Sequence, residues 1–243
     1  MPLLSVNLNK VAYLRNTRDV GMPDVLEAAR CALRAGAHGI TVHPRPDQRH
    51  ITPSDVRELK ALLANDFTGI EFNIEGNPFP EFMDLVREAR PHQCTLVPDD
   101  PDQTTSDHGW DLTQDAERLK PIIRDLKDWG VRVSLFMDYD SPDIPLAKKL
   151  GADRIELYTE PYAKAFAASA PDAVFTQFQK AARIADEAGL GVNAGHDLNL
   201  PNLPFFCEIP NLLELSIGLA LVADALFMGL DAAVRAYLKA MGN

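Results

Sequence analysis

The sequence has few cysteines and no long hydrophobic run. Its three cysteines, Cys31, Cys94 and Cys207, are far apart and odd in number. They match neither a disulfide framework nor a CxxC metal motif, and this favours a reducing, cytoplasmic compartment. No stretch approaches the roughly 20 uninterrupted apolar residues that a membrane helix needs. The opening MPLLSVNLNKV lacks the charged region, apolar run and cleavage site of a signal peptide.

Positive charge is also scarce. The chain has 24 Lys and Arg against 35 Asp and Glu, a net charge of −11. This balance argues against a broad surface for nucleic acid or for an acidic membrane. If the substrate is anionic, its positive pocket must be built locally, so clustered Arg and His residues are informative. The sequence also contains no GxGxxG, no Walker loop and no GxSxG nucleophile elbow.

What the sequence does contain is a regular alternation of short β-branched runs and longer amphipathic stretches. Several runs are apolar throughout, as expected for strands buried on both faces. Eight such runs within 243 residues predict an α/β protein, a single-domain (β/α)8 TIM barrel over residues 1–243. An open doubly wound sheet is the structural alternative. The predicted strands are Leu3–Asn7, Gly39–Val42, Ile70–Ile74, Gln93–Val97, Arg132–Phe136, Arg154–Leu157, Gly191–Asn193 and Leu213–Ile217.

Helical periodicity fills the intervals between these runs. A Thr-Pro-Ser-Asp capping signal opens the second helix at Thr52. Two further segments, Tyr158–Asp172 and Asp99–Trp110, are rich in small and polar residues, and we expect them to be lids. The predicted helices are Pro23–Ala35, Thr52–Ala64, Phe79–Ala89, Thr113–Trp129, Pro142–Leu150, Asp172–Ala188 and Leu219–Met241.

Polar residues collect just after the predicted strands, where a parallel barrel carries its active site. In His43-Pro44-Arg45, a histidine able to move protons stands beside an arginine able to hold a phosphate or carboxylate. Glu75 ends the third strand and is preferred as a base over Glu71, which we expect to face the helices or the bottom of the barrel. The structural alternatives are a loop histidine paired with a carboxylate and a carboxylate bonded to backbone amides.

The seventh strand leads into Asn193-Ala194-Gly195-His196, a small-residue turn that carries a histidine over the barrel mouth. The histidines His43, His50 and His196 have no HxH or HExxH spacing, so we expect no metal site. Lys10 is interpreted as an anion contact rather than a Schiff-base lysine. The acidic run from Asp99 to Asp102 is interpreted as a solvated loop.

Taken together, these residues resemble the pyridoxine 5′-phosphate synthase family. The matching strings extend over nearly the whole chain, and their order and spacing are more specific than any one of them. They are Val6-Asn7-Leu8, Leu14-Arg15-Asn16-Thr17-Arg18, Gly39-Ile40-Thr41-Val42-His43 with Arg45, Arg49-His50-Ile51-Thr52, Asn73-Ile74-Glu75, Leu96-Val97-Pro98, Val133-Ser134-Leu135-Phe136, Ile155-Glu156 and Val192-Asn193-Ala194-Gly195-His196.

The resemblance implies a TIM barrel that condenses 1-deoxy-D-xylulose 5-phosphate with 3-amino-2-oxopropyl phosphate, without a metal or organic cofactor. It assigns His43 and Glu75 as general bases, His196 as general acid and Glu156 as a stabiliser of charged intermediates. Such condensations consist mostly of proton transfers, which need groups in opposite protonation states. The residues expected to bind the substrates are Asn7, Asn9, Lys10, Arg18, Arg45, His50, Thr105, Asp197, Gly218 and Leu219.

Three positions depart from the family pattern. Asn9-Lys10 stands where Asp-His is frequent, Asp197 where Gly is usual, and Leu219 where a histidine would help to bind phosphate. These departures leave open a non-catalytic phosphate-ligand binding protein, and the same barrel could also serve a sugar-phosphate isomerase or aldolase. The resemblance also implies a homo-oligomer, an octamer, with small phosphorylated molecules as its ligands and neither nucleic acid nor membrane as a partner.

Overall fold

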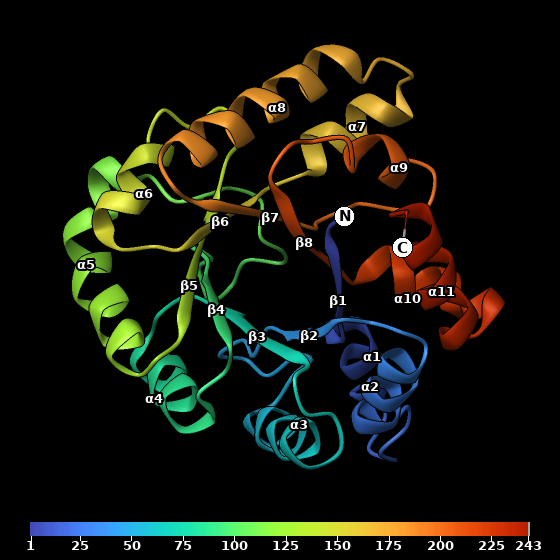
Figure 1. Ribbon diagram of the computed structural model, residues 1–243. Coiled ribbons are helices and arrows are strands. Elements are labelled where there is room, and N and C mark those ends of the chain that lie inside the picture. Colours follow the sequence, from blue (N-terminus) through green and yellow to red (C-terminus); the bar gives the residue numbers. More distant parts are fainter. Residues whose placement is uncertain (243) are drawn as a thin grey trace.

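The computed structural model describes residues 1–242 and contains a closed barrel of eight parallel strands, paired in chain order. Figure 1 shows the strands at the centre and the helices around them. The TIM-barrel prediction is therefore confirmed, and the open sheet is excluded. The strands are β1 (Leu3–Asn7), β2 (Gly39–Val42), β3 (Glu71–Gly76), β4 (Gln93–Leu96), β5 (Arg132–Met137), β6 (Arg154–Leu157), β7 (Gly191–Ala194) and β8 (Leu212–Ile217).

The helices form the outer layer, and two of the predictions for them need correction. The predicted helix Leu219–Met241 is two helices, because Gly229 adopts a left-handed φ of 80° between them. Three short helices, α1, α7 and α9, were not predicted. The helices are α1 (Asn9–Arg15), α2 (Val25–Arg34), α3 (Pro53–Asp66), α4 (Pro80–Ala89), α5 (Leu112–Asp128), α6 (Ile144–Leu150), α7 (Glu160–Ala167), α8 (Asp172–Glu187), α9 (Leu203–Phe206), α10 (Leu219–Met228) and α11 (Leu230–Ala240).

The predicted helix start at Thr52 is confirmed. The Thr52 side chain accepts a hydrogen bond from the Asp55 amide, and the Asp55 carboxylate accepts one from the Thr52 amide at 2.7 Å. This reciprocal cap satisfies two amide groups that would otherwise lack partners at the start of α3. Arg15 of α1 forms an ion pair with the same Asp55 carboxylate, so the cap also ties the first helix to the third.

The two faces of the strands differ in polarity. The apolar residues of β3, Phe72 and Ile74, are fully buried on the side of the helices, whereas the alternate residues Glu71, Asn73 and Glu75 are polar. The prediction of strands that are apolar on both faces is therefore wrong for the barrel interior. Polar side chains in that interior are joined by hydrogen bonds; the hydroxyl oxygens of Ser5 and Thr41, for example, lie 2.7 Å apart.

Beneath the middle of the barrel lies a cluster of buried and half-buried charged and amide side chains, which we call the basal network. Its ion pairs join Arg132 to Glu71 and Arg154 to Glu214. Gln93 accepts a hydrogen bond from Arg132 at 2.9 Å, and Asn193 accepts one from Arg154 at 3.0 Å. Glu71 thus caps the bottom of the barrel, one of its two predicted positions. The basal network consists of Glu71, Gln93, Arg132, Arg154, Asn193 and Glu214.

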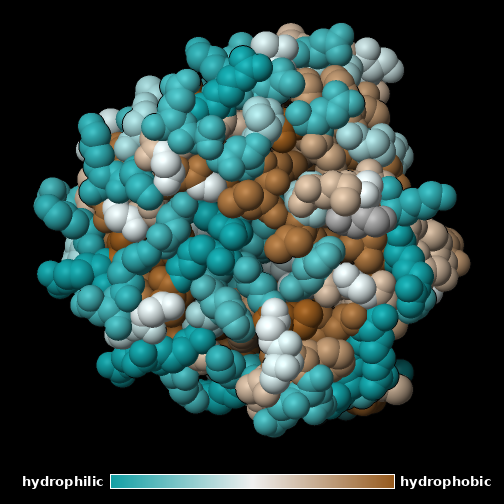
Figure 2. All heavy atoms as spheres, in the orientation of Figure 1, coloured by the Kyte–Doolittle hydropathy of each residue, from teal (hydrophilic) through white to brown (hydrophobic). Residues whose placement is uncertain are grey.

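The face of the molecule seen in Figure 2 is hydrophilic at its rim and carries hydrophobic side chains toward its middle. The two ends of the described chain lie close together, since a Cβ built on Gly242 would be 3.1 Å from the sulfur of Met1. No helix within residues 1–242 is both long and apolar enough to cross a membrane.

Candidate active site

A cavity of about 140 Å³ lies at the carboxyl ends of the strands, the end at which TIM barrels carry their active sites. All the predicted site residues except Arg18 line it. The predicted residues that the structure brings together are Asn7, Asn9, Lys10, His43, Arg45, His50, Glu75, Thr105, Glu156, His196, Asp197, Gly218 and Leu219.

Arg18 lies apart from this cavity. Helix α1 leads the chain outward from the end of β1, and Arg18 follows it on an exposed turn, where its amide donates to the Arg15 carbonyl. Arg15, three residues earlier in the chain, belongs to α1 and forms an ion pair with Asp55. The structure of this chain therefore does not place Arg18 among the residues of the pocket.

Two histidines are held as neutral bases on one side of the cavity. His43 is 6% exposed, and burial, followed by the positive charge of Arg45, lowers its pKa well below the ordinary range. His50 packs edge-on against it, with ring centroids 6.2 Å apart. Burial lowers the pKa of His50 to about 4, and its Nδ1 accepts a hydrogen bond from the Ile51 amide at 2.9 Å. Near neutral pH both rings are available to accept or relay protons.

Two carboxyl groups lie deeper, toward the barrel axis. Burial, and next the charge of Glu156, raise the pKa of Glu75 well above its ordinary value. Burial also raises the pKa of Glu156 to about 7. The Glu75 carboxyl group accepts hydrogen bonds from the side-chain amide of Asn7 at 3.4 Å and from the Ser216 hydroxyl at 3.3 Å. Glu156 accepts one from the Thr95 hydroxyl at 3.3 Å. Near neutral pH the pocket thus holds a protonated Glu75 and a partly protonated Glu156 beside neutral imidazoles, an arrangement suited to acid–base chemistry.

His196 stands over the opposite side of the cavity. Its Nε2 lies 3.2 Å from the Thr105 hydroxyl, its ring meets that of Tyr158 edge-on, and its carbonyl accepts a hydrogen bond from Thr159. Gly195, the residue before it, is required by packing, because a Cβ there would lie 2.0 Å from the Ser216 carbonyl oxygen. This close approach holds the turn after β7 against the end of β8.

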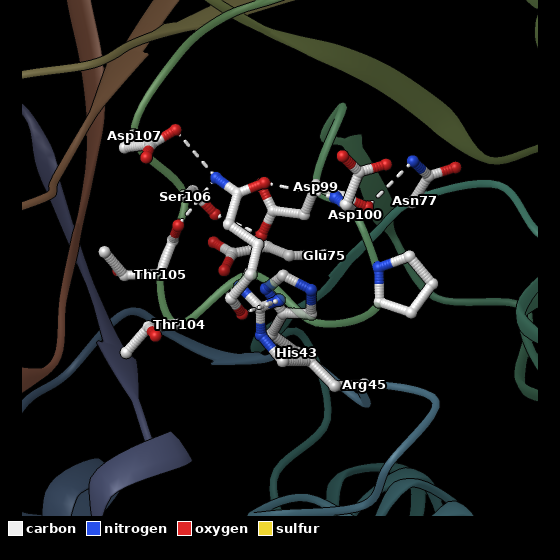
Figure 3. A network of polar contacts seen from close by, with 12 residues as sticks. His43, Arg45, Glu75, Asn77, Asp99, Asp100, Thr104, Thr105, Ser106 and Asp107 are labelled. Atoms are coloured by element: carbon white, nitrogen blue, oxygen red, sulfur yellow. Dashed lines mark hydrogen bonds and ion pairs between the residues drawn. The ribbon is translucent and has the colours of Figure 1, made fainter.

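A buried ion pair between Arg45 and Asp99 borders the cavity (Figure 3). The Asp99 side chain is 2% exposed, and its carboxylate also accepts from Ser106 at 2.7 Å. The prediction that Asp99 belongs to a solvated acidic run is therefore wrong. Arg45 and Arg49 both donate to the Gln103 carbonyl, at 3.1 and 3.0 Å. The loop after β4, one of the two predicted lids, is in this way fastened to the loop after β2.

The other predicted lid, Tyr158–Asp172, is largely helix α7. Tyr162 of this helix is fully buried, and its hydroxyl donates to the Asn202 carbonyl at 2.7 Å. Aromatic rings surround it, the nearest being Phe206 at 4.9 Å between centroids. The tyrosine fastens the segment to the barrel wall beside α9.

Of the three departures from the family pattern, Asn9-Lys10 has a clear local structure. The Asn9 side-chain oxygen accepts from the His43 amide at 2.9 Å, so Asn9 positions the strand end that carries this histidine. Lys10 lies 5.5 Å above the Tyr13 ring and keeps a positive charge at the cavity. Leu219 is 57% exposed and offers no cation at the start of α10. Gly218 packs within 3.2 Å of Asn7, measured from the Cβ that a larger residue would have.

A second cavity, of about 440 Å³, adjoins the first and shares His43 and Arg45 with it. Its remaining lining is mostly apolar or acidic, with Phe79, Phe82 and Glu81 among its residues, and within the described part of the chain it contains no further cation. This lining suits an anionic substrate less well than the smaller cavity does. Within residues 1–242, no group of three or more His, Cys, Asp or Glu side chains is arranged to hold a metal ion.

Comparison with solved structures reaches the same fold. The phosphoribosyl anthranilate isomerase of Thermotoga maritima matches with a TM-score of 0.63 and 13% identity over 100% of this chain and 99% of its own. The 4-hydroxy-2-oxoglutarate aldolase/2-deydro-3-deoxyphosphogluconate aldolase from TTHB1 matches with a TM-score of 0.63 and 18% identity over 98% and 94%. At such identities the likeness concerns the fold alone.

Comparison of sequences is more specific. Pyridoxine 5′-phosphate synthase of Xanthomonas axonopodis pv. citri is 55% identical over 97% of this chain and 94% of its own length. The synthase of Albidiferax ferrireducens is 53% identical over 99% and 97%. Residues 4–243 match the family model described as pyridoxal phosphate biosynthesis protein PdxJ. The chain therefore belongs to the PdxJ family of pyridoxal phosphate biosynthesis proteins.

Proposed function

We propose that this enzyme is a pyridoxine 5′-phosphate synthase of vitamin B6 biosynthesis. It condenses 1-deoxy-D-xylulose 5-phosphate with 3-amino-2-oxopropyl phosphate to give pyridoxine 5′-phosphate, phosphate and water. The observation that carries the proposal within the structure is the meeting of His43, Glu75, Glu156 and His196 around one small cavity at the barrel mouth. The family match supports this reaction, and the four groups are the ones we assign to it.

The protonation states of these groups suggest how they divide the work. His43 is buried and neutral, so it can take a proton from substrate carbon or nitrogen at the start of the reaction. Glu75 begins protonated and becomes a base once a cationic amine or imine of the substrate lies beside it, because a nearby positive charge lowers a carboxyl pKa. Glu156, with a pKa of about 7, stabilises such a cation in its ionised form.

The substrate phosphates are bound by positive side chains at the rim of the pocket. Arg45 can exchange its carboxylate partner Asp99 for a phosphate, since a guanidinium fork fits either group. Lys10 supplies a second charge next to Leu219, and it substitutes for the cation that this position lacks. The amide of Gly218 adds a neutral donor at the same edge.

The test is to incubate the purified, chelator-treated protein with both substrates and to detect pyridoxine 5′-phosphate by mass. His43→Asn and His196→Asn variants are assayed in parallel, with circular dichroism as the check on folding. We expect product from the wild type and large losses in both variants. A folded wild-type protein that binds the phosphates but releases no product would refute the synthase assignment.

An aldolase mechanism through a Schiff base is less well supported. Within residues 1–242, Lys10 is the only lysine that lines the cavity, and it stands in the first turn of α1 rather than on a strand. Lys10 is partly exposed, whereas a lysine that forms a Schiff base is usually enclosed in a desolvated apolar pocket. Borohydride reduction in the presence of substrate would trap such an adduct, and we expect none on Lys10.

We further propose a cytoplasmic homo-oligomer, an octamer by the family resemblance. The end of α10 supports an interface between copies, because Leu226, Phe227 and Met228 are 70%, 92% and 45% exposed. The cysteines Cys31, Cys94 and Cys207 form no disulfide, in keeping with a reducing compartment. Light scattering measures the assembly, and Phe227→Asp is expected to reduce its mass.

A further inference from the structure

The turn that carries His196 has an unusual residue at its tightest point. The Leu198 amide donates to the Gly195 carbonyl at 3.2 Å, so residues 195–198 form a β-turn. Its third residue, Asp197, has a φ of 61°, in the left-handed region where glycine is favoured. Most side chains are disfavoured there, and aspartate is one of the few that tolerate it, so this turn can carry a carboxylate where glycine is the usual choice.

Asp197 places a carboxylate beside the imidazole of its neighbour. A carboxylate oxygen of Asp197 lies 3.9 Å from His196 Nε2, and both side chains line the barrel-mouth cavity. The turn is held from both sides, since the Thr159 hydroxyl donates to the His196 carbonyl and the side-chain amide of Asn202 donates to the Asp197 carbonyl at 3.3 Å. These bonds fix the backbone of the turn from which the acid and the imidazole extend.

A negative charge at this point is unexpected in a pocket for two phosphates, because it repels them. A charge that opposes substrate binding is understandable if it acts on another group of the site. We propose that Asp197 is a positioning residue that favours the protonated form of His196, the general acid. This inference rests on the proposed function and assigns Asp197 a part in the proton transfers rather than in phosphate binding.

The surroundings of His196 show why such help is needed. Burial lowers the pKa of His196, and a general acid must hold its proton at working pH. Three acidic groups face the ring and oppose this effect, in the order Asp197, Asp99 and Glu160, whereas Lys10 adds to it, and burial leaves the His196 pKa below its ordinary value.

The remaining neighbours of the ring are Tyr158, the Thr105 hydroxyl and, across the cavity, His43. Asp99 is already paired with Arg45, and Glu160 with Lys164. Asp197 is therefore the acidic group whose charge is most directly available to His196.

The experiment compares Asp197→Asn and Asp197→Gly with the wild type. Asparagine keeps the size and tolerates the left-handed conformation, whereas glycine removes the strain together with the charge. Asp128→Asn, in the last turn of α5, removes an exposed charge elsewhere and serves as control. Two quantities are measured, the His196 pKa by NMR of ¹³C-labelled histidine and the pH dependence of kcat.

We expect the His196 pKa to fall by roughly half to one pH unit in both Asp197 variants, since the two groups are 3.9 Å apart and partly exposed. The alkaline limb of the kcat profile should shift downward by the same amount, because a general acid loses activity as it is deprotonated. The Tm of Asp197→Gly should equal or exceed that of the wild type. Asp128→Asn should change neither the His196 pKa nor the pH dependence of kcat.

Three results would overturn the inference. The His196 pKa could stay the same in both Asp197 variants, it could shift equally in Asp128→Asn, or kcat could fall in Asp197→Gly alone, which would indicate a purely structural role. Failure of the proposed function has a different signature. In that case the wild type makes no pyridoxine 5′-phosphate, while the NMR titration still shifts between variants.

Discussion

The buried ion pair between Arg45 and Asp99 gives the sharpest prediction for stability. Asp99→Asn preserves the shape of the side chain and removes its charge, while Arg45 stays in place. The Arg45 side chain is 4% exposed, and it also donates a hydrogen bond to the Gln103 carbonyl at 3.1 Å. The variant therefore leaves a guanidinium charge buried without a carboxylate.

Removing one member of a buried pair costs about 3–5 kcal/mol, much more than the loss of an exposed pair. In a protein of 243 residues this corresponds to a fall in Tm of roughly 6–20 °C. Asp100→Asn, at an exposed neighbouring carboxylate, is the matched control and should change Tm by less than about 2 °C.

Calorimetry with and without inorganic phosphate measures both consequences of the change. In Asp99→Asn the freed Arg45 can bind phosphate without first leaving its carboxylate, so phosphate should raise Tm more in this variant than in the wild type. The double variant Arg45→Met, Asp99→Leu removes both charges and should recover most of the lost stability. The reasoning is refuted if Asp99→Asn melts with the wild type, or if phosphate stabilises both proteins equally.

Three further predictions concern single residues of the site. His43→Asn should lower kcat by about 10²–10⁴ without unfolding the protein, and near wild-type turnover would remove His43 from the mechanism. Because burial raises the pKa of Glu156 from 4.5 to about 7, the stability that neutral Glu156 contributes is present below pH 4.5 and is lost as pH rises to about 7. Between pH 5 and pH 8 the free energy of unfolding, measured in urea, should fall by about 3 kcal/mol less in Glu156→Gln than in the wild type. Equal falls in the two proteins would contradict this. Gly195→Ala brings a methyl group to 2.0 Å from the Ser216 carbonyl oxygen and should cost about 1–3 kcal/mol, so an unchanged unfolding midpoint would show that the two turns can separate.

The strands could be predicted closely from the sequence, because short β-branched runs bounded by turns are a local signal. Helices α1 and α7 could not, since each is short and depends on distant partners. Arg15 of α1 binds Asp55, and Tyr162 of α7 packs among aromatic rings and bonds to Asn202. The break at Gly229 is carried by a single residue within a continuous apolar pattern.

The same distinction applies to the site. Residues that follow the strands were predicted to meet because parallel barrel strands end at one mouth, and all but Arg18 do so. The partner of Arg45 was not predicted, since Asp99 is 54 positions away and stands in an acidic run that resembles a solvated loop. Its position directly after the fourth strand was the one signal available. The protonation states also depend on burial, which sequence alone does not give.

The basal network has a consequence for how this barrel can evolve. Its four charged members come from four strands, β3, β5, β6 and β8, and each ion pair crosses the barrel interior. A neutral replacement of Arg154 leaves the buried Glu214 carboxylate unmatched, and a neutral replacement in the Arg132–Glu71 pair leaves a half-buried charge without its partner, while replacing a whole pair is tolerated better. We therefore expect single substitutions there to be less well tolerated than paired changes. Lineages of this fold would therefore preserve Arg132 with Glu71, and Arg154 with Glu214, as inherited units.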